Sequence, residues 1–389
     1  MPALTVLSAH NFYRHPGGED VVFAAEATLL RDHGHAVSIY EQNNTAIRSG
    51  RTAALQAIWN PSSHREIRTL TRGTAVAHFH NTFPLISPSA YYAASSQGAA
   101  VVQTLHNYRL ICPGALLSRN GVPCEDCITE NSLRPAITHA CYRGSRAATA
   151  SVAAMLTTHR VARTYQHAVD AYIALSDFAR EKFIAGGLPA DRILVKPNFV
   201  SPDPAPGIGS GNYALFAGRL SPEKGIETLA TAWSELSAIP LRVAGDGPLN
   251  QTRWPSGATA IGRQPRERIL ELMRDASVLV FPSTWYESDP LTILEAFACG
   301  TPVIASNLGS MAERVQHNHT GLLFNPGDPA DLAEKVRYAF THPEHLAQMR
   351  RNARREYEEK YTAERNYKML IAIYEQAIEN AQRRKRAAS

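Results

Sequence analysis

Two pairs of side chains, each with a short fixed spacing, could together bind a sugar diphosphate. Arg219 and Lys224 lie five residues apart in the stretch GRLSPEKG. A guanidinium holds phosphate oxygens through paired hydrogen bonds, and an ammonium acts on them as a point charge. Glu287 and Glu295 lie in the stretch ESDPLTILEAFACG, where carboxylates can accept hydrogen bonds from sugar hydroxyls. Solvated loop and helix charges are the alternative interpretation of both pairs.

The two carboxylates flank a turn that leads into a short helix. Pro290 has a fixed φ that suits a first helical turn, and Leu291 to Ala298 have a helix-forming composition. Free N–H groups and the helix dipole favour an anion at such an N-terminus. We therefore expect Ser288, Asp289 and Leu291 to lie against a phosphate of the ligand.

A second candidate anion site lies near the start of the chain. Residues 4–9 read as a buried strand and residues 21–33 as a helix, with Gly17 and Gly18 in the loop before the helix. Glycines at a loop–helix junction let backbone N–H groups approach a phosphate closely. A tight turn without a ligand explains the same two glycines equally well.

Histidines follow two predicted strands in the first half of the chain. The strand over residues 99–105 delivers His106 at its carboxyl end, where ligands of open α/β sheets bind. His78 and His80 alternate onto one face of the strand before it. This pair could bind a metal or face a substrate, and a satisfied structural histidine is the alternative for His106 as well.

Four of the five cysteines cluster in one loop-like stretch of the chain. Cys112, Cys124, Cys127 and Cys141 have the spacing C-x11-C-x2-C-x13-C. Four thiolates that include one C-x2-C pair suit a tetrahedral structural zinc site. Free thiols, or disulfides in an oxidising compartment, are the alternatives. Cys299 stands apart in the sequence and is interpreted as a packing residue.

The elements that must position these residues repeat an α/β pattern in each half of the chain. A length of 389 residues exceeds what one hydrophobic core usually supports, which predicts two domains. Residues 200–212, VSPDPAPGIGSGN, are rich in proline and glycine and read as a linker. We therefore expect an N-terminal domain over 1–199 with a cysteine-rich insertion at 107–145. The C-terminal domain is expected over 213–361.

Composition indicates a globular protein of ordinary polarity. Hydrophobic residues are 44% and charged residues 19% of the chain, and the net charge of +5 does not by itself indicate nucleic-acid binding. The sequence starts without a basic region and apolar core typical of a signal peptide, and no apolar run would span a bilayer. We expect a cytoplasmic protein. Residues 143–167 could face a membrane or a lipid acceptor, and a partly exposed helix of the domain is the alternative. The basic run at 383–386 would be attracted to an anionic bilayer, and a solvated end is its alternative.

The stretch around Glu287 and Glu295 resembles the family 4 retaining glycosyltransferases, which carry two glutamates separated by seven residues. The surrounding pattern PS-x-x-x-E-x-x-P-x-x-x-x-E-A-x-A-x-G-x-PV-x-A makes the resemblance specific. The motifs G-R-L-x-x-x-K-G, G-D-G-P and T-L-H are similar to those of the family. Near the start, Gly17 and Gly18 match its Gly-Gly-x-Glu motif, but Asp20 holds the position of its glutamate.

The resemblance implies a fold and an activity. The fold would be GT-B, with two facing doubly wound domains, an interdomain cleft, and a final helix over 362–389 that returns to the first domain. The activity would be transfer of a sugar, with retention, from a nucleoside diphosphate sugar to a glycan or lipid-linked acceptor. A role in cell-surface polysaccharide or glycolipid synthesis would follow.

The resemblance also implies roles for single residues, and no metal would be required for catalysis. Arg219 and Lys224 would stabilise the leaving diphosphate. Glu295 would bind the nucleotide ribose, while Glu287 and His106 would position the donor sugar. Gly218, Gly245 and Gly247 would lie against the nucleotide. Asp289-Pro290 departs from the residues usual after the first glutamate, which leaves the donor open.

Two other functions are compatible with the same motifs. A nucleotide-sugar epimerase or hydrolase on this scaffold would act on the donor without an acceptor. A catalytically silent glycan-binding protein would have no need of two cations placed against a leaving group, so Arg219 and Lys224 argue against it. Neither the donor base and sugar, nor the acceptor, nor the oligomeric state follows from the residues.

Overall fold

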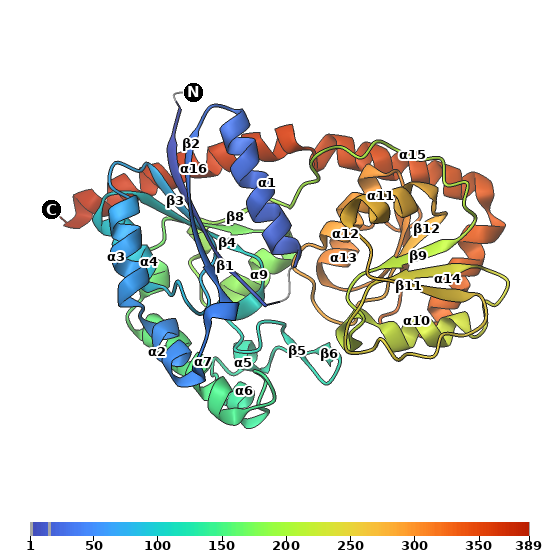
Figure 1. Cartoon of the computed structure of the whole chain (residues 1–389), viewed down its shortest axis with the longest axis horizontal. Coiled ribbons are helices and arrows are strands. Elements are labelled where there is room, and N and C mark those ends of the chain that lie inside the picture. The colour runs from blue at the N-terminus through green and yellow to red at the C-terminus, as the bar shows by residue number, and fades with distance from the viewer. Residues whose placement is uncertain (1–2, 15–16, 389) are drawn as a thin grey trace. The chain divides into compact units, whose positions relative to one another are not determined.

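The structure, a computed structural model, describes residues 3–14 and 17–388 and divides into two compact units. The first unit comprises Met1–Leu117, Glu125–Pro197 and Asn366–Ser389, and the second comprises Ser118–Cys124 and Asn198–Arg365. The main chain therefore passes between the units after Leu117, Cys124, Pro197 and Arg365. Figure 1 shows the helices and strands of both units.

The first unit is built on a six-stranded parallel sheet in the order β2-β1-β3-β4-β7-β8. Its strands are β1 (Thr5–Phe12), β2 (Ala36–Asn43), β3 (Val76–Asn81), β4 (Ala100–Leu105), β7 (Ala171–Ala174) and β8 (Ile193–Val195). Every residue of β3, β4 and β7 is buried, as expected for parallel strands that helices cover on both faces. The strand order reverses between β1 and β3, the kind of position at which α/β sheets bind ligands.

The helices of the first unit are distributed along all three of its chain segments except the start of the first. They are α1 (Gly18–Asp32), α2 (Gly50–Ile58), α3 (Pro61–Leu70), α4 (Ser89–Ser96), α5 (Asp126–Thr129), α6 (Arg134–Thr138), α7 (Arg146–Val161), α8 (Thr164–His167), α9 (Asp177–Ala185) and α16 (Ala363–Ala388). The apolar residues of α7, which include Val152, Met155 and Leu156, pack into a buried cluster with Phe83 and Leu133. These side chains are therefore covered by protein, whereas Val161 at the end of α7 is 80% exposed. Contact of this helix with a membrane stays a prediction.

Helix α16 completes the core of the first unit from a segment that follows the second unit in the sequence. Leu370, Tyr374, Ala377 and Ala381 recur every three or four residues, which places them on one face of the helix. They pack against strand residues such as Val76 of β3. The core of the first unit therefore depends on segments from both sides of the second unit.

The second unit has a six-stranded parallel sheet in the doubly wound order β11-β10-β9-β12-β13-β14. Its strands are β9 (Ala214–Ala217), β10 (Leu241–Ala244), β11 (Ala258–Gly262), β12 (Val278–Phe281), β13 (Val303–Ser306) and β14 (Gly321–Phe324). Its helices are α10 (Ile226–Trp233), α11 (Arg266–Asp275), α12 (Leu291–Ala298), α13 (Gly309–Arg314), α14 (Pro329–Thr341) and α15 (Pro343–Lys360). The strand order reverses between β9 and β12.

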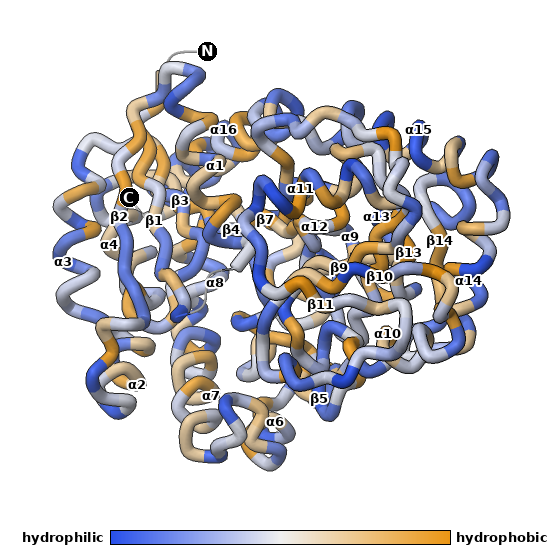
Figure 2. The backbone as a smooth tube through the Cα atoms, turned by 45° about the vertical axis from the view of Figure 1, so that its right-hand side comes forward, coloured by the Kyte–Doolittle hydropathy of each residue, from blue (hydrophilic) through white to orange (hydrophobic). Residues whose placement is uncertain are grey.

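Two hydrophobic clusters pack against the sheet of the second unit. Leu215 of β9 belongs to one cluster with helix α12, and Phe216 belongs to the other with α10 and α14. Figure 2 shows the apolar character of strands such as β9 and β13 along the backbone. Successive strand residues thus bury both faces of the sheet, and the loops at the strand ends remain to form a site.

The cysteine-rich segment contains a short hairpin of β5 (Ser118–Arg119) and β6 (Val122–Pro123). The division into units groups this hairpin, as part of Ser118–Cys124, with the second unit rather than with the flanking residues. Helices α5 and α6 follow it in the first unit. Among the described residues, no helix combines the length and the apolar character needed to cross a bilayer.

Candidate functional site

The loop after β9, residues 218–225, carries the two predicted phosphate-binding cations and is called the phosphate loop below. Arg219 is exposed, and no described residue forms a hydrogen bond or ion pair with its guanidinium. Lys224 closes a turn of 3-10 helix, and Gly225 begins the connection to α10 with a φ of 71°. A Cβ on Gly225 would lie 1.9 Å from the carbonyl oxygen of Pro282. Glycine therefore lets this loop press against the end of β12.

The G-D-G-P turn after β10 supports the phosphate loop. A Cβ on Gly245 would lie 1.8 Å from the carbonyl oxygen of Gly218, and one on Gly247 would lie 2.4 Å from that of Leu220. The N–H of Leu220 donates to the carbonyl of Asp246 at 2.8 Å. These contacts give Gly245 and Gly247 a structural reason to be glycine, namely the position of the phosphate loop. Their direct contact with a nucleotide stays a prediction.

Glu287 is held by three donors at the carboxyl end of β12. Its Oε1 accepts from Lys224 Nζ at 2.5 Å, from Ser283 Oγ at 2.7 Å and from Trp285 Nε1 at 2.9 Å. The Lys224 ammonium also lies 5.4 Å from the ring centroid of Phe281. Glu287 itself is only 7% exposed. The structure thus joins two predicted catalytic residues into one preorganised ion pair.

Asp289 has a packing role that the sequence did not reveal. Its carboxylate accepts from the backbone N–H of Asn198 and from Arg314 Nε, each at 2.7 Å. Burial raises the pKa of Asp289, and the charge of Arg314 opposes that rise. Because both carboxylate oxygens are engaged, a ligand would meet this residue through its backbone. Ser288 and Leu291, the other residues expected there, lie at the same turn before and at the start of α12.

Glu295 projects from α12 and is 7% exposed. Its Oε1 accepts from Arg266 Nε, at the start of α11, at 2.7 Å. Burial raises the pKa of Glu295, while the hydrogen bond and charge of Arg266 act in the opposite direction. No sequence motif singled out Arg266, since it lies between Gly262 and α12 in a stretch without recognisable spacing. The expected ribose contact of Glu295 stays a prediction.

The first unit has its own polar cluster where β1 and β3 end. Gly17 precedes α1, and its N–H donates to Asp20 Oδ2 at 2.8 Å, so that Asp20 caps the helix. Asp20 Oδ1 lies 2.7 Å from His10 Nε2. Glu19 lies beside Asn81, and burial, followed by the charge of Asp20, raises its pKa to about 8. Asp20, which stands where the Gly-Gly-x-Glu motif has its glutamate, is therefore bonded to Gly17 and His10 within the fold. Gly17 and Gly18 themselves are exposed.

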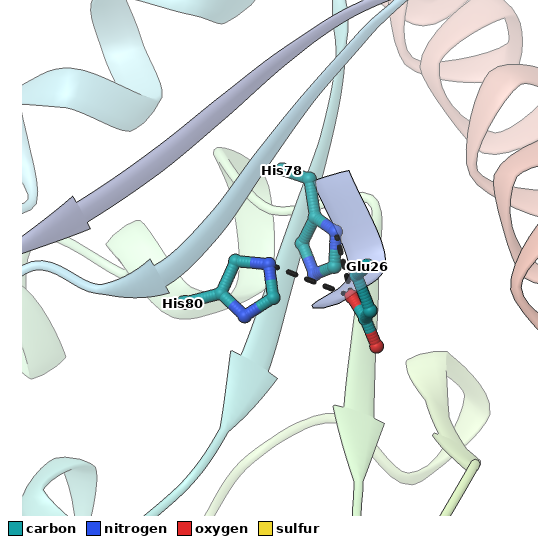
Figure 3. Close-up of side chains that lie close together, drawn as sticks. All are labelled: Glu26, His78 and His80. Carbon is teal, nitrogen blue, oxygen red and sulfur yellow. Dashed lines mark ion pairs between the residues drawn. The ribbon is translucent and has the colours of Figure 1, made fainter. Parts of the chain in front are cut away.

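His106 follows β4 and is half-buried. Its Nε2 lies 3.1 Å from Nδ1 of His80. Figure 3 shows His80 and His78 of β3 pointing toward Glu26 of α1. Burial lowers the pKa of His78 to about 4 and lowers the pKa of His80 and of His106 well below the usual value.

Sequence reasoning missed Glu26 and its partner Lys196. Both side chains are buried, and Lys196 Nζ lies 2.5 Å from Glu26 Oε1. A signal was available, because Glu26 lies among Val22, Phe23 and Leu30 on the buried side of α1. A charge on the apolar face of a helix requires a buried partner. The sequence could show the charge but not the partner, which is far away along the chain.

The four clustered cysteines do not form a three-donor group in the part of the chain that the structure describes. The groups whose donor atoms lie within 4.8 Å of one another are Glu26–His78–His80 and His10–Glu19–Asp20. Cys112 and Cys141 nevertheless both approach Gly114, where an added Cβ would lie 3.6 Å from Sγ of the first and 3.5 Å from Cβ of the second. Zinc binding by Cys112, Cys124, Cys127 and Cys141 stays a prediction.

The arrangement of the second unit agrees with comparisons to known proteins. Residues 204–356, less than half of the chain, match the family described as "Glycosyl transferases group 1". An uncharacterized glycosyltransferase of Methanocaldococcus jannaschii is 28% identical over 193 residues, which cover 48% of this chain and 54% of that protein. The chain spans about half the length of the curated relatives it matches.

Solved structures resemble the whole chain at low sequence identity. HepE of Anabaena, in complex with UDP and glucose, has a TM-score of 0.64 at 17% identity, covering 97% of this chain and 99% of its own. Sucrose-phosphate synthase from Thermosynechococcus elongatus has a TM-score of 0.68 at 16% identity, covering 99% and 100%. These likenesses show the fold. The chain therefore has the GT-B fold of two Rossmann-like units, and residues 204–356 match the group 1 glycosyl transferases.

Proposed function

We propose that this protein is a retaining glycosyltransferase that moves a sugar from a nucleoside diphosphate sugar to a glycan or lipid-linked acceptor. The ion pair of Lys224 with Glu287, at the position where the strand order of the second unit reverses, is the observation that carries the proposal. Ligands of α/β sheets bind at such positions. A binding protein without transfer activity would gain nothing from a cation preorganised against a leaving group.

The chemistry divides among a few side chains of the second unit. The bond from the sugar to the diphosphate breaks, and negative charge grows on the diphosphate as it leaves. The exposed guanidinium of Arg219 and the ammonium of Lys224 stabilise that charge from one loop. Glu287 positions the sugar, and Glu295 accepts hydrogen bonds from the ribose. The retaining stereochemistry is proposed from the two-glutamate motif, and the donor nucleotide from the UDP that accompanies HepE in its solved structure.

The acceptor is proposed to bind to the first unit. A polar cavity of about 410 Å³ there is lined by residues that include Gln42, Arg48, Gln56 and Glu66. These side chains offer both donors and acceptors of hydrogen bonds, as a glycan requires. The proposal places the protein in the cytoplasm, at the membrane surface when the acceptor is lipid-linked. The basic end of α16 has other contacts, because Arg384 pairs with Asp170 at 3.0 Å and Lys385 donates to Gly98.

Thermal unfolding with UDP, GDP, ADP and their common sugar conjugates tests the proposal. A ligand at a hundred times its dissociation constant adds about 2.7 kcal/mol to stability, so a bound nucleotide raises the melting temperature. The sugar nucleotide identified in this way should be consumed only when a glycan or lipid-linked acceptor is added. Free sugar or an epimer formed from the donor alone would identify a hydrolase or epimerase instead.

A matched variant keeps this experiment specific. Lys335 forms ion pairs with Asp331 and Glu334 on α14, outside the proposed site. Lys335→Met should keep the nucleotide-induced rise in melting temperature, and Lys224→Met should lose most of it. An equal rise in both variants, or no response of the parent protein to any nucleotide, would refute the proposed donor site.

A further inference from the structure

A line of polar atoms crosses the buried interior of the first unit and ends at His106. Lys196 Nζ lies 2.5 Å from Glu26 Oε1, and Glu26 Oε2 lies 3.5 Å from His80 Nε2. His80 Nδ1 in turn lies 3.1 Å from His106 Nε2. The side chains of Lys196, Glu26 and His80 are at most 2% exposed, whereas His106 is half-buried. The line therefore runs from the fully buried ammonium of Lys196 to the partly exposed ring of His106.

Two atoms in the middle of this line lack a hydrogen-bond partner, although Glu26 Oε2 also lies 3.8 Å from His78 Nδ1, a nitrogen already engaged with Tyr374. Glu26 Oε2 and His80 Nε2 are both buried, and neither forms a hydrogen bond of ordinary geometry with any described residue. Buried polar groups without a partner are rare because each one has given up its hydrogen bonds with water. The two atoms lie 3.5 Å apart. Figure 3 draws His80 turned toward Glu26, with a dashed line for this ion pair. One N–H···O hydrogen bond, from His80 to Glu26, satisfies both.

That hydrogen bond determines which ring nitrogens carry protons. A carboxylate can only accept, so His80 carries its proton on Nε2 and leaves Nδ1 as an acceptor. His106 must then donate from Nε2 to His80 Nδ1, and its own Nδ1 is left unprotonated. The rings of the two histidines are inclined by only 19° with their centroids 5.3 Å apart, which suits a bond between ring edges. In the described part of the chain, the ring of His106 has no other hydrogen-bond partner.

The same residues fit a cation poorly. Glu26, His78 and His80 offer three donor atoms within 4.8 Å, but the ammonium of Lys196 already neutralises the carboxylate. Both nitrogens of His78 are engaged, one with the hydroxyl of Tyr374 at 2.9 Å and the other with that of Thr104 at 2.7 Å. A divalent ion would therefore meet a positive charge and a histidine with no free nitrogen.

We propose that Glu26, oriented by Lys196, fixes the tautomer of His80 and through it that of His106, so that His106 presents a bare Nδ1 as a hydrogen-bond acceptor. Glu26, Lys196 and His80 are positioning residues in this scheme. Nδ1 of His106 would accept a hydrogen bond from a hydroxyl group of the donor sugar, and this last step alone rests on the proposed function. Burial lowers the pKa of His80 and of His106, which keeps both rings neutral and gives each one a defined tautomer.

Nitrogen NMR of the ligand-free, full-length protein with ¹⁵N-labelled histidine tests the tautomers directly. Protonated and bare ring nitrogens have widely separated shifts, and the signals of His106 are those lost in His106→Gln. In the parent protein, Nδ1 of His106 should appear bare and Nε2 protonated. A proton on Nδ1 of His106 in the parent protein would refute the proposal.

Glu26→Gln should reverse the assignment. The ammonium of Lys196 can only donate, so it holds the amide oxygen, and the amide NH₂ then turns toward His80 Nε2. His80 becomes protonated on Nδ1, and Nδ1 of His106 changes from bare to protonated. Asp170→Asn is the matched control, because Asp170 is a second buried carboxylate of this unit, paired with Arg384. It should leave the tautomer of His106 unchanged, and a reversal in both variants would mean that general destabilisation moves the proton.

Binding measurements separate this inference from the proposed function. If both hold, Glu26→Gln should bind UDP as the parent does, and should bind the UDP-sugar found in the thermal screen about tenfold more weakly. A reversed tautomer with unchanged binding of that sugar nucleotide would keep the tautomer scheme and refute the sugar contact. An unchanged tautomer in a folded Glu26→Gln protein would refute the scheme whatever the activity.

Discussion

Lys224 and Glu287 lie 63 positions apart in the sequence, and their side chains meet in an ion pair of 2.5 Å. The partners come from the loops after β9 and β12, which are neighbouring strands of the second sheet. Because Ser283 and Trp285 also donate to the carboxylate, Glu287 would remain bonded if the ammonium turned to a phosphate of the proposed donor. The pair therefore holds a cation in place before the ligand arrives, at little cost in reorganisation.

Replacing either cation of the phosphate loop should slow transfer strongly. Arg219→Ala and Lys224→Met should each lower kcat/KM by about a hundredfold, since removal of one preorganised charge stabiliser costs about 3 kcal/mol in the barrier. Steady-state kinetics against Lys335→Met, whose lysine lies on α14, measures the loss. Near-normal turnover in both loop variants would show that the diphosphate does not leave against this loop.

The two glutamates should separate in a calorimetric titration with the nucleoside diphosphate alone. Glu295→Ala should weaken its binding, because the buried carboxylate is expected to meet the ribose. Glu287→Ala should bind the nucleotide normally and lose sugar transfer. The reverse result would exchange the two roles. Arg266→Ala, which frees the Glu295 carboxylate from its 2.7 Å hydrogen bond, should lie between parent and Glu295→Ala in nucleotide affinity.

Gly225 and Gly262 form a matched pair for the geometry of the phosphate loop. Their φ angles are 71° and 68°, so alanine costs both positions about 1–2 kcal/mol of backbone strain. An added Cβ meets the carbonyl oxygen of Pro282 at Gly225 but nothing within 4 Å at Gly262. Gly225→Ala should therefore lose clearly more stability in urea unfolding, and should lose kcat as the loop shifts. Equal losses would mean that the contact with Pro282 is not needed.

Stability should fall as the pH rises through the titration of Glu19. Burial raises its pKa in the folded protein from 4.5 to about 8, so the folded state holds a proton that the unfolded state releases between these values. The melting temperature should decline from pH 5 to pH 8 for this reason. Glu19→Gln removes the group and should flatten that decline, with Glu181→Gln as a control on α9. A parallel pH profile in Glu19→Gln would exclude this contribution.

The cysteine cluster should carry one structural zinc ion. Zinc–thiolate binding provides folding free energy for a segment with little apolar surface of its own. Elemental analysis of protein purified without added metal should give about one equivalent, lost in Cys124→Ser/Cys127→Ser and kept in Cys299→Ser. Less than about a tenth of an equivalent in the parent, or disulfides in a reduced sample, would contradict the site.

Local sequence patterns predicted the strands and loops around the site well. The strand expected over residues 99–105 became β4 at Ala100–Leu105, and the helix expected from Leu291 to Ala298 is α12. The spacing of Arg219 and Lys224 also placed both on one loop after β9. These features depend on neighbouring residues, so they can be read without knowledge of the tertiary fold.

Contacts between distant segments could not be predicted in the same way. The bond from Lys224 to Glu287 depends on β9 lying beside β12, although β10 and β11 come between them in sequence. Asp289 was predicted from its place in the motif to lie against a phosphate. Its carboxylate bonds to Asn198 and Arg314 could not be predicted, because they depend on how distant segments pack. The amphipathic pattern of α7 likewise showed an apolar face but not the cluster that covers it.

The return of α16 to the first unit sets an order of assembly during synthesis. Leu370, Tyr374 and Ala377 complete the core of that unit, and they leave the ribosome only after the whole second unit has been made. Most of the second unit, Asn198–Arg365, is a continuous segment that emerges earlier. Domains generally fold as units during translation. The second unit can therefore be complete while the first still exposes the apolar surface that α16 covers, and such exposed surface makes a nascent chain prone to aggregate.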